Sequence, residues 1–176
     1  LSLVRRLKAA GVRHIALLTG DNQGTADAVG RAVGVDEVRA ELLPEDKMRA
    51  VEEIARRHGP VAMVGDGVND APALATATVG IAMGAAGTDA AIETADIALM
   101  LDDLDHLPWL VHHARRSLRI VRQNITFALG VKVAFMGLAL AHMATLWMAI
   151  AADMGSSLIV IFNALRLLHT DAKKEP

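Results

Sequence analysis

Two aspartates that follow a short apolar run are the residues best placed for chemistry in this sequence. The run at 61–64 is typical of a strand, and the polar turn after it holds Asp66, Asn69 and Asp70. Pro72 is typical of the first turn of a helix. A strand that ends in such a turn delivers both carboxylates to one edge of a sheet, where their oxygens suit Mg²⁺. The alternative is an ordinary loop in which Asp and Asn cap the next helix.

A second polar turn, Thr19-Gly20-Asp21, follows the apolar run at 14–18 and precedes a helix expected over 24–33. A strand, a glycine-containing turn and a helix together present backbone N–H groups and a hydroxyl to a phosphate. The sequence therefore indicates a phosphate-binding loop here, with a simple helix cap as the alternative.

Lys47 lies in the first turn of a helix that Pro44 opens, where a positive charge opposes the helix dipole. One interpretation is that this cation is held where a phosphate binds. The other is a lysine side chain that simply extends into solvent.

Short apolar runs alternate with helical patterns through the first hundred residues. Strands are expected at 14–18, 37–40, 61–64, 78–82 and 96–100. Helices are expected at 3–10, at 24–33, from 44, from 72 and, as a single turn, at 89–94. Alternation of this kind predicts an α/β fold with a Rossmann-like parallel sheet that helices cover on both faces.

The composition excludes several classes of function. Hydrophobic residues make up 53% of the 176 residues and are concentrated in the last third of the chain. A net charge of −2 gives no indication of nucleic-acid binding. The absence of cysteine excludes disulfides, thiolate metal sites and cysteine nucleophiles. Because the chain begins with Leu1 and shows no signal-peptide pattern, we expect a fragment of a longer protein.

The stretch between residues 125 and 168 contains only three formally charged residues. It is long enough for two transmembrane helices, expected at about 124–143 and 146–165. Arginines precede the first span, and basic residues end or follow the second. Residues 1–123 and the C-terminal tail are therefore predicted to be cytoplasmic, in a multi-pass protein of the cell membrane. The alternative is a pair of buried helices in a large soluble protein.

Lys132 and Asp153 fall inside these predicted spans. Charged residues are costly in a bilayer, normally face the interior of a helix bundle and often mark an ion pathway. Asp153 is short and cannot reach the interface, so it is predicted to belong to an ion pathway. Lys132 is either its electrostatic partner or a side chain that extends to the cytoplasmic interface.

Three motifs occur in a fixed order: T-G-D at 19–21, P-E-D-K at 44–47 and M-V-G-D-G-V-N-D-A-P-A-L at 63–74. Together with the apolar hairpin they resemble the back half of the catalytic domain of a P-type ATPase, a member of the haloacid dehalogenase superfamily. The resemblance covers essentially the whole chain. It implies an ATP-driven cation pump that forms and hydrolyses a phospho-aspartate.

The resemblance also implies a role for each motif residue. Asp66 would hold Mg²⁺, with Asp70 and Asn69 completing the metal and phosphate environment. In the T-G-D motif, Thr19 would donate to a phosphate oxygen, Gly20 would supply backbone and Asp21 would order the loop. Lys47 would neutralise the phosphoryl charge. These roles agree with phosphoryl transfer, which depends mainly on positioning and electrostatic stabilisation.

The hairpin resembles the last two helices of heavy-metal pumps. An Asp-x-Gly at Asp153, with Lys132 in the preceding helix, is similar to the zinc/cadmium/lead group. Copper pumps of this family carry a methionine and serine pair there, which Ser156 and Ser157 echo in part, and cobalt-type pumps carry a His-Glu pair. A carboxylate oxygen favours a divalent ion such as Zn²⁺ or Cd²⁺ over Cu⁺.

Parts of the family pattern are absent from this sequence. The D-K-T-G-T motif with the phosphorylated aspartate, the Cys-Pro-Cys motif and the nucleotide-binding and actuator domains would lie upstream of Leu1. We therefore expect residues 1–105 to complete a phosphorylation domain and 106–176 to form a cytoplasmic helix, the hairpin and a short tail. The expected partners are a divalent heavy-metal ion, the lipid bilayer and the upstream domains, and the fragment alone should be inactive.

Three other interpretations remain open. The chain is alternatively part of a membrane-anchored phosphatase of the same superfamily, which would carry a D-x-D-x nucleophile motif upstream. It is alternatively part of a copper pump, or a truncated paralogue that regulates a partner without catalysis.

Overall fold

The computed structural model describes residues 2–66, 69–83, 94–100 and 103–168. The chain divides into two compact units, 1–110 and 111–176, and each is described by itself. The helical turn expected at 89–94 lies outside the described residues except for Thr94.

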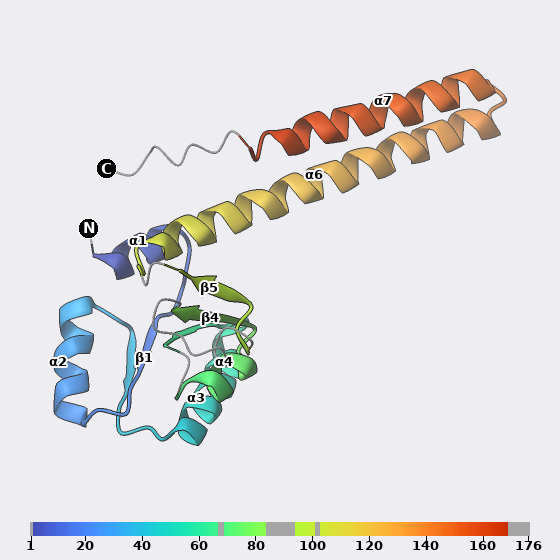
Figure 1. Ribbon diagram of the computed structural model, residues 1–176. Helices are drawn as coiled ribbons and strands as arrows, with labels where there is room; N and C mark the ends of the chain where they lie inside the picture. The colour runs from blue at the N-terminus through green and yellow to red at the C-terminus, as the bar shows by residue number, and fades with distance from the viewer. Residues whose placement is uncertain (1, 67–68, 84–93, 101–102, 169–176) are drawn as a thin grey trace. The chain divides into compact units, whose positions relative to one another are not determined.

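Every strand pair in the described part of the first unit is parallel (Figure 1). One sheet pairs β1 (Ala16–Leu18) with β2 (Glu37–Arg39). The other has the order β3-β4-β5, with β3 at Ala62–Gly65, β4 at Val79–Met83 and β5 at Ile97–Leu99. The predicted α/β fold with parallel strands is therefore confirmed.

The first strand is shorter than the apolar run that predicted it. β1 begins at Ala16, two residues after the expected start at His14. The N–H of Ile15 donates instead to the Asp36 carboxylate at 3.0 Å, and the C=O of Ile15 accepts from the N–H groups of Asp36 and Glu37. The polar residues at the start of β2 therefore fasten the entry to β1.

Four helices of the first unit begin and end close to the predicted positions. They are α1 (Leu3–Ala9), α2 (Gln23–Val33), α3 (Pro44–His58) and α4 (Ala71–Thr76). The N–H of Leu43 donates to the side chain of Asp46, which satisfies one of the free donors at the start of α3. Gly34 ends α2 with φ at +83°, a conformation that glycine adopts without strain.

The apolar core of this unit joins α3 and α4 to the start of the second sheet. Val51, Met63, Ala73 and Leu74 form its buried centre. Leu18, at the end of β1, packs against the same cluster. Since Leu18 directly precedes the T-G-D turn, the core anchors the strand that ends at this turn.

The second unit consists mainly of two long helices that lie side by side (Figure 1). They are α6 (His106–Leu140) and α7 (Leu146–Leu165), and both are long and apolar enough to cross a membrane. Their most apolar windows have mean hydropathies of 1.4 and 1.7, and none of either window is buried. An apolar surface of this kind is unlike a buried core helix and agrees with contact with lipid.

The first apolar helix ends earlier than the predicted span. α6 stops at Leu140, three residues before the expected end at residue 143. His142 adopts a positive φ of 59° in the connection, and the Thr145 hydroxyl accepts from the N–H of Met148 to cap α7. The turn is therefore built from a left-handed histidine and a threonine cap, two signals that are weaker in sequence than glycine or proline.

Candidate phosphoryl site and membrane polar residues

Lys47 and Asp70 form an ion pair beside the end of β3. The Lys47 Nζ donates to the Asp70 Oδ1 at 2.6 Å, and the two side chains are only 14% and 13% exposed. Lys47 comes from the first turn of α3, and Asp70 precedes α4. Lys47, which the sequence left as either solvated or functional, is therefore paired with Asp70, an aspartate of the motif at 63–74.

Gly65 makes this arrangement possible. A Cβ atom at Gly65 would lie 2.7 Å from the Asp70 Oδ2 and 2.8 Å from the Asp70 Cβ. Both separations are far below van der Waals contact, so any larger residue at this position would displace Asp70. The glycine is thus required by close approach of the aspartate, which sequence analysis did not recognise.

The T-G-D turn is ordered by its own side chains. The Thr19 hydroxyl donates to the Asp21 Oδ2 at 2.9 Å, and the Asp21 N–H donates to the Thr19 Oγ1 at 3.1 Å. The cap of α2 is Asn22, whose side chain accepts from the N–H of Thr25. Because Asn22 already caps the helix, Asp21 is available to orient Thr19, and Gly20 is exposed between them.

The oxygen-rich donors at this edge fit Mg²⁺. Asp66 and Asn69 are exposed, and Asp70 is the acid paired with Lys47. Carboxylate and amide oxygens are the ligands that Mg²⁺ prefers, and an exposed carboxylate leaves room for its waters. Since Lys47 already contacts one oxygen of Asp70, Asp66 is the carboxylate most open to a metal.

The polar residues predicted inside the membrane are not all brought together. Asp153 and Lys132 are both exposed, and within the described residues no ion pair joins them. The hydroxyls of Ser156 and Ser157 each donate to the backbone C=O of Asp153 at 2.9 Å. These serines therefore bond within their own helix and leave the Asp153 carboxylate uncommitted.

A hydrogen-bonded asparagine pair joins the two apolar helices. The Asn163 Nδ2 donates to the Asn124 Oδ1 at 2.7 Å, and the Asn124 Nδ2 donates to the C=O of Val160 at 3.4 Å. Near the same end, an Arg116 Nη2 donates to the C=O of Arg166 at 3.1 Å. Asn124 was missed in the sequence, although an asparagine at the start of an apolar helix is a usable signal.

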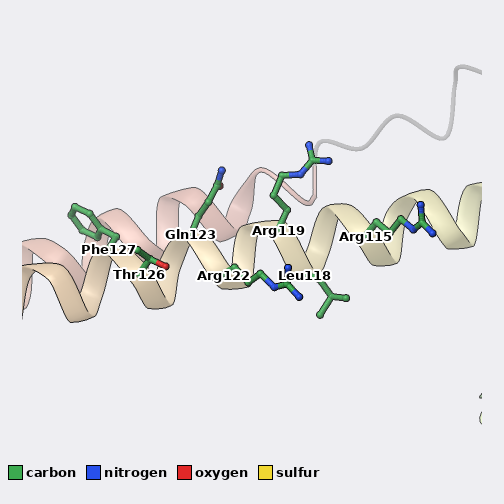
Figure 2. Close-up of a pocket in the computed structure, with 7 residues that line it drawn as sticks. All are labelled: Arg115, Leu118, Arg119, Arg122, Gln123, Thr126 and Phe127. Carbon is green, nitrogen blue, oxygen red and sulfur yellow. The ribbon is translucent and has the colours of Figure 1, made fainter. Parts of the chain in front are cut away.

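Arginines gather on α6 just before its apolar part. This helix carries an open groove of about 750 Å³, and Figure 2 shows the side chains that line it. It is lined by Arg115, Leu118, Arg119, Arg122, Gln123, Thr126 and Phe127. The change from guanidinium groups to Phe127 along one helix is the pattern expected where a helix passes from water into lipid.

Comparison with known proteins agrees with this geometry. Residues 1–78 match the family of haloacid dehalogenase-like hydrolases. A probable cadmium-transporting ATPase of Staphylococcus aureus strain MRSA252 is 52% identical over 98% of this chain and 24% of its own length. The cadmium, zinc and cobalt-transporting ATPase of Bacillus subtilis strain 168 is 45% identical, with 97% of this chain and 25% of that protein covered.

A solved structure matches across both units. The crystal structure of a zinc-transporting PIB-type ATPase in the E2.Pi state has a TM-score of 0.88 and 48% sequence identity. The match covers 95% of this chain and 27% of that one. This chain thus spans about a quarter of the length of the relatives it matches.

The parallel α/β fold and the match over residues 1–78 identify the first unit as haloacid dehalogenase-like. Over about a quarter of their length, the homologues of this chain at 45–52% identity are cadmium- and zinc-transporting P-type ATPases. P-type ATPases of the haloacid dehalogenase-like kind generally use Mg²⁺ and ATP.

Proposed function

We propose that this chain is part of an ATP-driven exporter of Zn²⁺, Cd²⁺ or Pb²⁺ that works through a phospho-aspartate. The observation that carries the proposal is that two features occur in the same chain. A mostly buried Lys47–Asp70 pair lies beside the end of β3, and an uncommitted Asp153 lies on an apolar helix. The first feature suits phosphoryl transfer, and the second suits passage of a divalent ion.

In the proposed phosphoryl site each residue has a separate task. Lys47 neutralises charge on the phosphoryl group, and Thr19, whose hydroxyl donates to Asp21 in the structure, turns this hydroxyl to donate to a phosphate oxygen. Asp66 holds Mg²⁺ with help from Asn69 and Asp70, and the bound ion supplies further charge neutralisation. Apart from the rotation of the Thr19 hydroxyl away from Asp21, these side chains are positioned before the reaction, so little further reorganisation is needed when charge develops.

The two sheets leave room in this scheme for an upstream strand. β1 and β3 each have one edge without a strand partner among the described residues. We propose that a strand of the longer protein, with the phosphorylated aspartate at its carboxyl end, pairs with these edges. It would deliver that aspartate between Thr19 and Asp66, which follow the ends of β1 and β3.

The proposed domain boundaries follow the change in composition. Residues 1–105 complete the phosphorylation domain, and 106–176 form the cytoplasmic helix, the hairpin and the tail. The arginine-lined groove before the apolar part of α6 supports a cytoplasmic location for residues 1–123 and for the C-terminal tail. The partners are the transported ion, the bilayer and the upstream domains.

Asp153 is proposed to bind the transported ion, with Lys132 as a counter-cation that aids its release. The hydroxyls of Ser156 and Ser157 donate to the backbone C=O of Asp153, which leaves the Asp153 carboxylate as the group in this turn that is free to bind an ion. An oxygen ligand favours a divalent ion over Cu⁺.

The metal specificity of the full-length protein tests the proposal. ATP hydrolysis by the purified protein should rise with Zn²⁺, Cd²⁺ or Pb²⁺ and respond less to Cu⁺. Copper as the best activator would contradict the divalent assignment. If no metal stimulates ATP hydrolysis and the protein hydrolyses small phosphate esters, the membrane-anchored phosphatase is indicated instead. A gene that begins near Leu1 would indicate the truncated regulatory paralogue.

A further inference from the structure

A group of side chains of metal-ligating types lies at the opposite edge of the α/β unit from Lys47. His14 precedes β1, Glu37 is the first residue of β2, and His58 is the last residue of α3. Thr19 follows the other end of β1, and Lys47 lies at the other end of α3. The eleven residue steps from Lys47 to His58 span roughly 16 Å of helix, so the two groups are separate.

The three side chains converge although they are far apart in sequence. The His14 Nε2 lies 3.0 Å from the Glu37 Oε2. The rings of His14 and His58 stack with their centroids 4.0 Å apart and their planes 7° from parallel. One nitrogen of each histidine and one oxygen of Glu37 all lie within 4.8 Å of one another.

One of these separations, between His14 and Glu37, is close to that found in a zinc site. With zinc bonds of about 2.0–2.2 Å in a tetrahedron, neighbouring ligand atoms lie about 3.3 Å apart. The His14 to Glu37 contact already has this spacing. Two parallel rings cannot both contain the ion in their planes, so His58 must rotate out of the stack. His58 is exposed at the end of α3, and its rotation disturbs no packed core.

The carboxylate is held in place from behind. The Arg39 Nε donates to the Glu37 Oε1 at 2.6 Å, and the Arg39 Nη1 donates to the Glu53 Oε2 at 2.6 Å. The second oxygen of Glu37 is therefore the one presented to His14. Ligating carboxylates are ordinarily oriented by such outer hydrogen bonds. Glu53 also balances the charge of Arg39, which would otherwise oppose a cation nearby.

We propose that His14, Glu37 and His58 form a binding site for a divalent d-block cation such as Zn²⁺, with a fourth position left to water. Two imidazoles and one carboxylate favour this class of ion over Mg²⁺, which prefers oxygen ligands alone. Bound metal would fasten the starts of β1 and β2 to the end of α3. The site is independent of the proposed transport function, because none of its residues belongs to the phosphoryl site or to the membrane helices.

The test uses the full chain in detergent, with Asp153→Asn present throughout to remove the proposed membrane ligand and with excess Mg²⁺ to saturate Asp66. Zn²⁺ binding is measured by calorimetry for this parent, for the added change His58→Gln and for the added change His106→Gln. His106 is a matched control, since it is exposed and, among the residues that the structure describes, its ring has one carboxylate nearby, Asp103 at 3.8 Å. His58→Gln should weaken the binding of one Zn²⁺ about tenfold or more, and His106→Gln should not.

Two further measurements make the result decisive. Zn²⁺ should raise the thermal unfolding midpoint of the parent but not of His58→Gln, because a ligand stabilises the state it binds. Co²⁺ should give the strong visible absorption of a four-coordinate ion in the parent and lose it in His58→Gln and in Glu37→Gln. Equal Zn²⁺ binding by the parent and His58→Gln, or an equal loss in His106→Gln, would overturn the proposal.

Discussion

At the scale of single residues, the proposed phosphoryl site depends on close contacts of a few small and charged side chains. Lys47 and Asp70 are both mostly buried and satisfy one another. Asp70 can occupy its position only because Gly65 has no side chain. The need for a glycine at position 65 and the ion pair between Lys47 and Asp70 are thus linked at one point of the sheet edge.

Replacing Gly65 with alanine should break this linkage. The new methyl group would overlap Asp70, which must shift away from Lys47, at a cost of about 1–3 kcal/mol in the free energy of unfolding. Thermal unfolding measures the stability, and metal-stimulated ATP hydrolysis by the full-length protein measures the site. Gly24→Ala is the matched control, because its Cβ would meet only the Asn22 Oδ1 at an ordinary 3.5 Å. Equal behaviour of the two variants would show that the Gly65 contact is unimportant.

At the scale of elements, charged residues at the start of β2 fasten neighbouring segments. The hydrogen bond from Lys8, together with that from the Ile15 N–H, holds the pKa of Asp36 below its ordinary 3.8. The hydrogen bond from Arg39, followed by that with His14, holds the pKa of Glu37 below its ordinary 4.5. Both carboxylates are therefore more easily ionised in the folded chain than in the unfolded one.

Folding should consequently become less favourable in acid. The stabilisation from a lowered carboxyl pKa is complete above the ordinary value and is lost as the pH falls through the lower folded value. For Asp36 and Glu37 the loss begins near pH 4.5 and continues below 3.8. Unfolding midpoints measured from pH 6 to pH 3 should show a smaller decrease for Asp36→Asn than for the unchanged chain. Glu45→Gln, at an exposed acid in α3, is the control, and the same reduction in both variants would contradict this account.

The membrane hairpin should depend on its asparagine pair. Removing the Asn163 side chain leaves the Asn124 amide without its interhelical partner, and such bonds contribute about 0.6–2 kcal/mol in membranes. Asn163→Ala should therefore lower the stability of the hairpin in detergent, measured by unfolding with a denaturing detergent. Ser157→Ala should have a smaller effect, because that hydroxyl bonds within its own helix. A larger effect of the serine change would mean that the asparagines do not join the helices.

At the scale of the whole molecule, most of the fold was predictable because hydrophobic periodicity and turn chemistry agree along the chain. The strand ending at Gly65 and the helix that Pro44 opens were both expected, and so was the apolar hairpin. Boundaries that depend on weaker signals were less accurate, as the early end of α6 at Leu140 shows. The turn there is made by His142 in a left-handed conformation, which its residue type does not demand.

Contacts between distant segments were beyond sequence reasoning. The motifs named Lys47 and Asp70 separately, but their direct pairing depends on how α3 packs on β3. The cluster of His14, Glu37 and His58 has no sequence spacing that would reveal it, since its members come from three elements. Periodicity reports which face of an element is buried, not which polar side chains meet across elements.

The central claim is that this chain carries a divalent-ion ligand on its last helix and couples it to a phosphoryl site. Asp153→Ala in the full-length protein tests it most directly, with Met154→Ala at the next exposed position of α7 as the control. The account predicts that Zn²⁺ no longer stimulates ATP hydrolysis in Asp153→Ala and still does so in Met154→Ala. Zn²⁺-stimulated hydrolysis that survives Asp153→Ala unchanged would contradict the claim.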